Sequence, residues 1–198
     1  MNKTHRAALA ACALVLGACA TAKFNATWVN PEAQNLSFKA GDKVLAMVPI
    51  KNEGMRRIAE DSLARAISAR GLQGVPSYTL VPTELTKDKA RAAAEKVGAA
   101  GAVVMRVLAK DKVSSSQLSQ SSSYTAYWDS NSGWSSPNPS DMRSDTVLVV
   151  ETLVYDMRQD KLVWAGQSQT TNASKVDGLI SELADQTARQ LRQQGLVK

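Results

Sequence analysis

Apolar positions along the chain change from runs typical of strands to the spacing typical of a helix, and back again. Three short apolar runs, at 44–50, 74–81 and 101–108, are rich in strand-forming residues. Between them, over 55–70 and 87–97, apolar residues recur about every four positions, which is the helical period. This order predicts a βαβαβ unit with right-handed crossovers and a partly parallel sheet with helices laid against it.

Glycines and a proline indicate where these elements end. Gly71 and Gly98 follow the two predicted helices and suit the left-handed conformation that terminates a helix. Thr86 is expected to cap the second helix. Pro76 cannot donate to a strand ladder, so the strand that contains it is expected at the edge of the sheet.

The C-terminal third adds two strands and a helix. Residues 145–155 form the longest apolar, β-rich run, and the polar turn 156–160 leads into a second run at 161–170, which predicts an antiparallel hairpin. A third helix is predicted from Ser174, and its apolar face is formed by Val176, Leu179, Ile180, Leu183, Thr187 and Leu191.

These elements predict one domain of the α/β class (mixed α+β) over 43–198, with two or three layers. The element order is β-α-β-α-β-β-β-α, with a mixed sheet packed by three helices. A body of this length is enough for one hydrophobic core.

The first predicted helix has a strongly charged side. We interpret that side as a solvated face, and the alternative is a surface for a partner or a lipid headgroup. Its charged residues are Arg56, Arg57, Glu60, Asp61 and Arg65.

The regular pattern stops between 114 and 140. This insertion holds twelve serines and a single charged residue, Asp129. Its aromatic side chains are candidates for an interaction surface, because the segment is too polar to bury them in a core of its own. They are Tyr124, Tyr127, Trp128 and Trp134. The alternatives are a disordered spacer, or two strands that extend the sheet.

The N-terminus has the pattern of a lipoprotein signal peptide. Lys3 and Arg6 precede an apolar stretch at 7–16, well short of the roughly 20 residues that a membrane-spanning helix needs. The stretch leads into Leu16, Gly17, Ala18 and Cys19, which resemble the bacterial lipobox. In that motif the cysteine is diacylated and becomes the new N-terminus. The alternative is an ordinary secretory signal, cut within Ala18-Cys19-Ala20.

This prediction divides the chain into a signal peptide at 1–18, a lipidated tether at 19–42 and a periplasmic domain at 43–198. Within the tether, 24–29 could form a short edge strand. By resemblance to Gram-negative sorting signals, a residue other than Asp after the cysteine, here Ala20, implies transfer to the outer membrane. For a Gram-negative source we therefore expect a lipid anchor there, with the domain facing the periplasm.

Cleavage after residue 18 changes the chemistry that remains. His5, the single histidine, and Cys12 would be removed, and the sulfur of Cys19 would carry lipid. Serine–histidine and cysteine–histidine catalysis and His- or Cys-ligated zinc are excluded for such a product. The removed segment holds two of the 24 basic residues and none of the 18 acidic ones, so the formal net charge falls from +6 to +4. We expect no nucleic-acid partner in the envelope, and no cofactor besides the covalent lipid on Cys19.

Two charged residues interrupt apolar strands. Arg106 lies in the 101–108 run and Glu151 in the 145–155 run. If these strands are neighbours, the two side chains form a cross-strand ion pair. The alternative, Glu151 as a catalytic acid, would need a second carboxylate at a defined distance. We therefore assign no catalytic residue and no metal ligand.

Several segments carry a family resemblance. They are the first strand with the Arg-rich helix and Gly71, the Ser-rich aromatic insertion, and Val150-Glu151-Thr152-Leu153-Val154-Tyr155-Asp156 with Leu162-Val163-Trp164. Over about 44–196 the chain resembles uncharacterised proteobacterial envelope lipoproteins, whose α/β domain is similar to the N-terminal domain of the Tol-system periplasmic protein and to the curli-secretion lipoprotein. The resemblance implies a small domain for assembly or protein contact, with no activity to carry over.

We therefore expect an outer-membrane lipoprotein that is not an enzyme. Its domain would act in envelope assembly by binding another envelope protein, while the acyl anchor binds the membrane. The sequence sets no oligomeric state. The alternative is an envelope module that binds glycan or lipid. A pore is not expected, because 114–140 lacks the alternation of a membrane strand.

Overall fold

The computed structural model describes residues 23–35, 38–108, 147–171 and 176–197. The strands are β1 (Lys23–Val29), β2 (Lys43–Met47), β3 (Gln73–Pro76), β4 (Gly101–Leu108), β5 (Val147–Asp156) and β6 (Lys161–Thr171). The helices are α1 (Glu53–Ser68), α2 (Lys87–Val97) and α4 (Val176–Gln193), with short 3-10 turns η1 (Pro31–Asn35) and η2 (Ser77–Thr79).

The six strands form one mixed sheet in the order β1-β6-β5-β4-β2-β3. β2 is parallel to both β3 and β4, whereas β4, β5, β6 and β1 pair antiparallel. The α/β class and the mixed sheet with helices packed on it are confirmed, and β3, which contains Pro76, lies at an edge.

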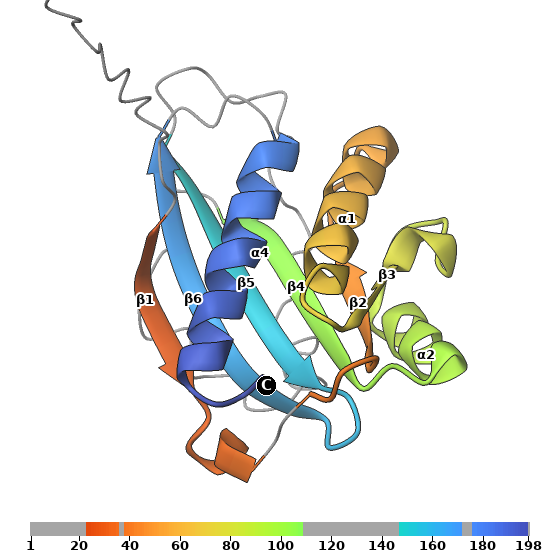
Figure 1. Ribbon diagram of the computed structural model, residues 1–198. Coiled ribbons are helices and arrows are strands. Elements are labelled where there is room, and N and C mark those ends of the chain that lie inside the picture. Colours follow the sequence, from red (N-terminus) through yellow and green to blue (C-terminus); the bar gives the residue numbers. More distant parts are fainter. Residues whose placement is uncertain (1–22, 36–37, 109–146, 172–175, 198) are drawn as a thin grey trace, which may run out of the picture.

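Helices cover both faces of the sheet, so the domain has three layers. From β2 the chain moves one way along the sheet to β3 and then back past β2 to β4. Right-handed crossovers in opposite directions place their helices on opposite faces. α1 and α4 pack on one face and lie side by side across it (Figure 1), while α2 packs on the other face, against Leu45, Met47 and Val104.

Local sequence sets the helix ends much as the pattern predicts. The side chain of Asn52 accepts a hydrogen bond from the backbone N–H of Met55 at the start of α1, an N-cap not predicted from the sequence. Gly98 ends α2 at φ 62°, and Gly71 follows α1 at φ 84°, both in the left-handed region. Thr86 stands at the N-cap of α2, but its side chain makes no capping hydrogen bond.

The possible edge strand at 24–29 is confirmed, so part of the segment predicted as a tether over 19–42 belongs to the sheet. Lys23–Val29 is strand β1, paired with β6, and the ring of Phe24 meets Trp164 edge-on at 5.1 Å between centroids. Asn30 continues this attachment, since its amide Nδ2 donates to the carbonyl of Leu162 at 3.0 Å. The sequence indicates this strand only weakly, because a short edge strand takes its stability from the strand beside it. The sheet therefore begins at Lys23.

Gly74 allows α1 to approach β3 closely. A Cβ atom built at Gly74 would lie 2.2 Å from the carbonyl oxygen and 2.7 Å from the Cα of Ala64 in α1. Both are backbone atoms, so neither can move without shifting the helix. The contact between α1 and the sheet edge thus requires glycine at this position.

We expect Gly74→Ala to destabilise the domain by about 2–3 kcal/mol, because the added methyl group forces α1 away from β3. Urea unfolding followed by circular dichroism measures this change. The matched control is Gly178→Ala in the first turn of α4, where an added Cβ meets nothing within 4 Å. That control should gain about 0.5–1 kcal/mol from helix propensity. Equal effects of the two substitutions would contradict the close-approach account.

Candidate functional site

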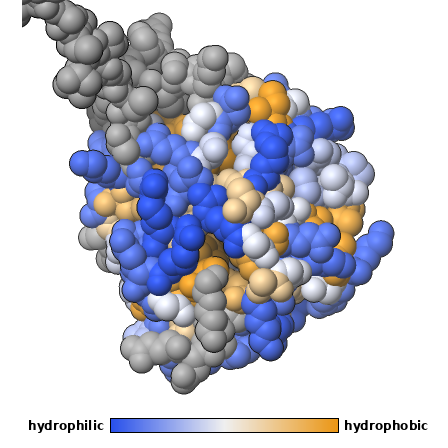
Figure 2. Space-filling model, in the orientation of Figure 1, coloured by the Kyte–Doolittle hydropathy of each residue, from blue (hydrophilic) through white to orange (hydrophobic). Residues whose placement is uncertain are grey.

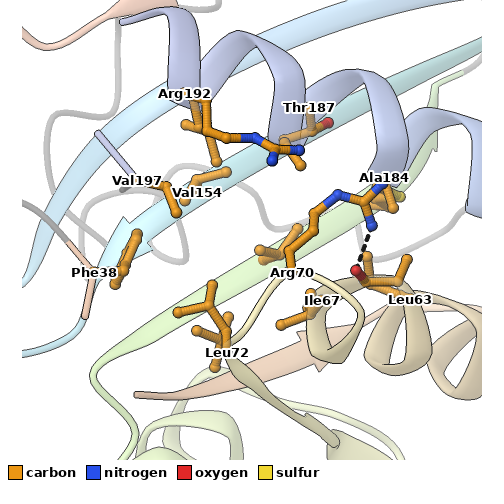
Figure 3. A pocket seen from close by; sticks show the side chains of 16 residues that line it. Phe38, Leu63, Ile67, Arg70, Leu72, Val154, Ala184, Thr187, Arg192 and Val197 are labelled. Atoms are coloured by element: carbon orange, nitrogen blue, oxygen red, sulfur yellow. Dashed lines mark hydrogen bonds between the residues drawn. The ribbon is translucent and has the colours of Figure 1, made fainter. Parts of the chain in front are cut away.

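An apolar pocket lies between α1 and α4, above the sheet (Figure 3). Its enclosed volume is about 50 Å³. Sheet residues including Val103, Met105 and Val154 lie beneath it. The helices contribute small side chains at Ala66, Ala184 and Ala188, and these leave the space unfilled.

The hydroxyl of Thr187 does not make the pocket polar. It donates to the backbone carbonyl of Leu183 at 2.8 Å, one turn earlier in α4. Its hydrogen-bonding capacity is therefore used inside the helix. The pocket lining is almost entirely apolar apart from two arginines.

Arg70 and Arg192 are the cations of this pocket. Figure 3 shows Arg192 reaching from α4 toward the side on which Arg70 lies. The guanidinium of Arg70 joins the two helices, because it donates to the carbonyl of Ala66 and pairs with Asp185. Arg192 is exposed and forms no ion pair within the described residues.

A second, polar groove shares residues with the apolar pocket. Ala66, Arg70 and Arg192 line both, and Arg65, Asp177 and Asp185 are among the others that line the groove. Hydrophilic side chains surround an apolar hollow on this face of the molecule (Figure 2). The site between α1 and α4 thus has an apolar interior and a polar, arginine-containing surround.

Two of the charged residues predicted on the solvated face of the first helix are buried. Arg56 is 5% exposed and Glu60 is fully buried, so that part of the sequence interpretation is wrong. The Nε of Arg56 donates to Oε1 of Glu60 at 2.9 Å. The pair lies where α1 faces the end of β2 and the turn after β3. Polar groups of both segments form hydrogen bonds with it.

Glu60 gathers four hydrogen-bond donors. Its Oε1 accepts from Arg56, from the N–H of Val48 at 3.3 Å and from the hydroxyl of Ser77 at 2.8 Å, and its Oε2 accepts from the N–H of Tyr78 at 2.7 Å. Arg56 also donates to the hydroxyl of Ser77 and to the carbonyl of Thr83. With all these groups paired, the network ties α1, β2 and η2 together.

The rest of the charged side of α1 is accessible. The phenol of Tyr78 donates to Asp61 at 2.9 Å, and this hydrogen bond is the main reason that the pKa of Tyr78 is raised. The guanidinium of Arg57 lies 5.7 Å from the centre of the Tyr78 ring, within cation–π range. A solvated face therefore describes Arg57 and Asp61, but not Arg56 and Glu60.

Arg106 and Glu151 come together as neighbouring strands require. They are register partners on β4 and β5, and Nε of Arg106 donates to the carboxylate of Glu151. Glu151 is only 3% exposed as a side chain, and Arg106 is 17% exposed. Gln167 on β6 is the next register partner and is also buried. This geometry gives Glu151 a structural role within the sheet.

Several residues named from the sequence lie outside the described residues. They are the lipobox residues Leu16, Gly17, Ala18 and Cys19, and the aromatic residues Tyr124, Tyr127, Trp128 and Trp134. None of the described helices is both long enough and apolar enough to cross a bilayer. Across the described ranges, no group of three or more His, Cys, Asp or Glu residues could hold a metal ion.

Comparisons with known proteins found structural likeness alone. No family model and no curated protein matches the chain. Two solved structures of PelC from Paraburkholderia phytofirmans, both dodecamers and one a substituted form, are 14% identical with TM-scores of 0.46 and 0.43. They cover 83% and 81% of this chain, and 94% and 91% of the PelC chains. Likeness at this level carries no argument about what this chain binds or how it assembles.

We expect Glu60→Gln to destabilise the domain by about 3–5 kcal/mol, because it leaves Arg56 buried without a counter-ion. Chemical unfolding of the purified chain measures the loss. Glu53→Gln is the control, since Glu53 pairs with Arg57 on the same helix while both side chains are more than half exposed. That substitution should cost at most about 0.5 kcal/mol. A Glu60→Gln variant as stable as the control would refute the role of the network.

Proposed function

We propose that this protein is an outer-membrane lipoprotein of a proteobacterial envelope family, and that its α/β domain acts by binding a partner rather than by catalysis. The lipobox at Cys19 carries this proposal. Position 19 lies four residues before Lys23, the first residue of β1. Four residues span at most about 14 Å, so an acyl anchor at Cys19 would hold the β1 end of the sheet close to the membrane.

The sheet register indicates which other segments would share that end. Lys23 on β1 pairs with Gln169 on β6, Gln169 pairs with Val149 on β5, and Val149 pairs with Leu108 on β4. Four strands at about 4.8 Å spacing place this row within about 15 Å. Leu108 and Val147 flank the aromatic insertion, so the chain enters and leaves it at the anchor end of the sheet.

This arrangement supports a protein contact made near the membrane. The insertion carries Tyr124, Tyr127, Trp128 and Trp134, residue types that favour interfaces with one apolar and one wet side. A second contact candidate is the outer edge of β1, which among the described strands pairs with β6 alone. The alternative function is the binding of lipid or glycan. The apolar pocket between α1 and α4 favours lipid over glycan.

Cys19→Ser should abolish incorporation of labelled palmitate in a Gram-negative host and remove the protein from the outer-membrane fraction, because no thiol remains to accept the diacylglycerol. The matched control is Cys12→Ser, which changes the other cysteine of the chain and should retain both properties. Ala20→Asp should keep the label but move the protein to the inner membrane. Palmitate labelling that survives Cys19→Ser would refute the anchor.

Deleting residues 117–138 should remove a protein partner that is cross-linked to the wild-type chain in cells and identified by mass spectrometry. The thermal unfolding transition should stay unchanged, because the deletion leaves the described strands and helices intact. A partner that is retained at wild-type yield would exclude the insertion as the interface.

A further inference from the structure

The site between α1 and α4 has an apolar interior and a polar surround. Its interior is a narrow pocket with sheet residues such as Val103 and Met105 beneath it. Its surround is the polar groove that contains Arg65, Arg70 and Arg192. Such a site receives a molecule that has an apolar chain and a polar head, with the chain inside and the head in the groove.

The charges around the groove favour an anionic head. Three arginines face two aspartates, Asp177 and Asp185, and Asp185 is already paired with Arg70. Among the described residues the Nε of Arg70 finds no acceptor, so one donor of its guanidinium is available. Arg192 has no ion pair within the described residues and lines both the pocket and the groove. A carboxylate or phosphate beside Arg192 would form a charge-assisted hydrogen bond.

The size of the pocket restricts the chain. A water molecule needs about 10–15 Å³ by the same measure, so 50 Å³ holds roughly four groups of methylene size. That space admits the end of one acyl chain and is too small for two chains side by side. The lining fits this occupant, because burying each methylene gains about 0.8 kcal/mol only where the surroundings are apolar.

We propose that this pocket binds the acyl chain of a single-chain anionic amphiphile, whose head group lies at Arg192. The class includes free fatty acids and lysophospholipids, which share one chain and one anionic head. The inference specifies the ligand of the binding role proposed above, and it rests on that role. The experiment below measures ligand contact rather than lipidation or fractionation, so its failure is distinguishable from a failure of the localisation test.

Photo-cross-linking tests the proposal on the mature lipoprotein in phosphatidylcholine nanodiscs. The probes are dodecanoic acid and lysophosphatidylglycerol, each with a diazirine at the methyl end of its chain, and mass spectrometry maps the adducts. We expect adducts on pocket residues such as Leu63, Met105 and Ala184. The stronger of the two labels identifies the head group, and the diazirine form of dodecanol should label about tenfold less, because it lacks the charge.

Two variants tie the labelling to the site. Arg192→Glu should lower labelling by dodecanoic acid about tenfold, while Arg189→Glu, exposed on the same helix and outside the lining, should leave it unchanged. Ala188→Leu fills the pocket and should also lower labelling by dodecanoic acid. Since Arg192 is exposed, its substitution keeps the test valid even if Ala188→Leu unfolds the domain.

Four results would overturn the proposal. The first three concern the labelling. They are adducts confined to residues outside the pocket, labelling that is unchanged in Arg192→Glu, and equal labelling by dodecanol and dodecanoic acid. The fourth concerns a protein occupant. A photoreactive amino acid in place of Arg192 that cross-links a second copy or another protein, together with no fatty-acid adduct on the wild-type chain, would assign the pocket to a protein.

Discussion

The buried carboxylate of Glu60 is the constraint on which the arrangement of the parallel half of the sheet depends. A charge that is fully buried costs several kcal/mol unless every lone pair finds a donor, and Glu60 finds four, from Val48, Arg56, Ser77 and Tyr78. These donors come from the residue after β2, from α1 and from η2. The carboxylate therefore fixes the position of α1 relative to the end of β2 and to the turn that follows β3.

The position of α1 then determines the geometry of the candidate site. Gly74 allows the helix to approach β3 closely at one side, and Arg70 joins it to Asp185 of α4 at the other. Between these two attachments, Ala66 faces Ala184 and Ala188 across a space that small side chains do not fill. The pocket thus arises where small side chains meet between two packed helices, with arginines around an apolar interior.

β1 connects this fold to the proposed membrane anchor. An edge strand that starts four residues after Cys19 would leave the proposed lipid little freedom relative to the sheet. The pairing of β1 with β6, strengthened by Phe24 against Trp164 and by Asn30 against Leu162, makes this segment part of the folded domain. In the proposed orientation, the flanks of the aromatic insertion lie at the same end of the sheet.

The sequence alone predicted the strands from β2 to β6, the helices and the edge position of Pro76, because period and turn residues are local properties. It gave the pairing of Arg106 with Glu151 only on the condition that their strands are neighbours, and the tertiary structure meets that condition. It failed for Arg56 and Glu60, since charge predicts exposure unless distant donors compensate it, and those donors come from three segments. It gave β1 only as a possible edge strand at 24–29 inside a tether, because such a strand needs a partner far along the chain, here β6. The pocket was not predictable either, because a cavity depends on how far apart two helices pack, and only the tertiary structure decides that distance.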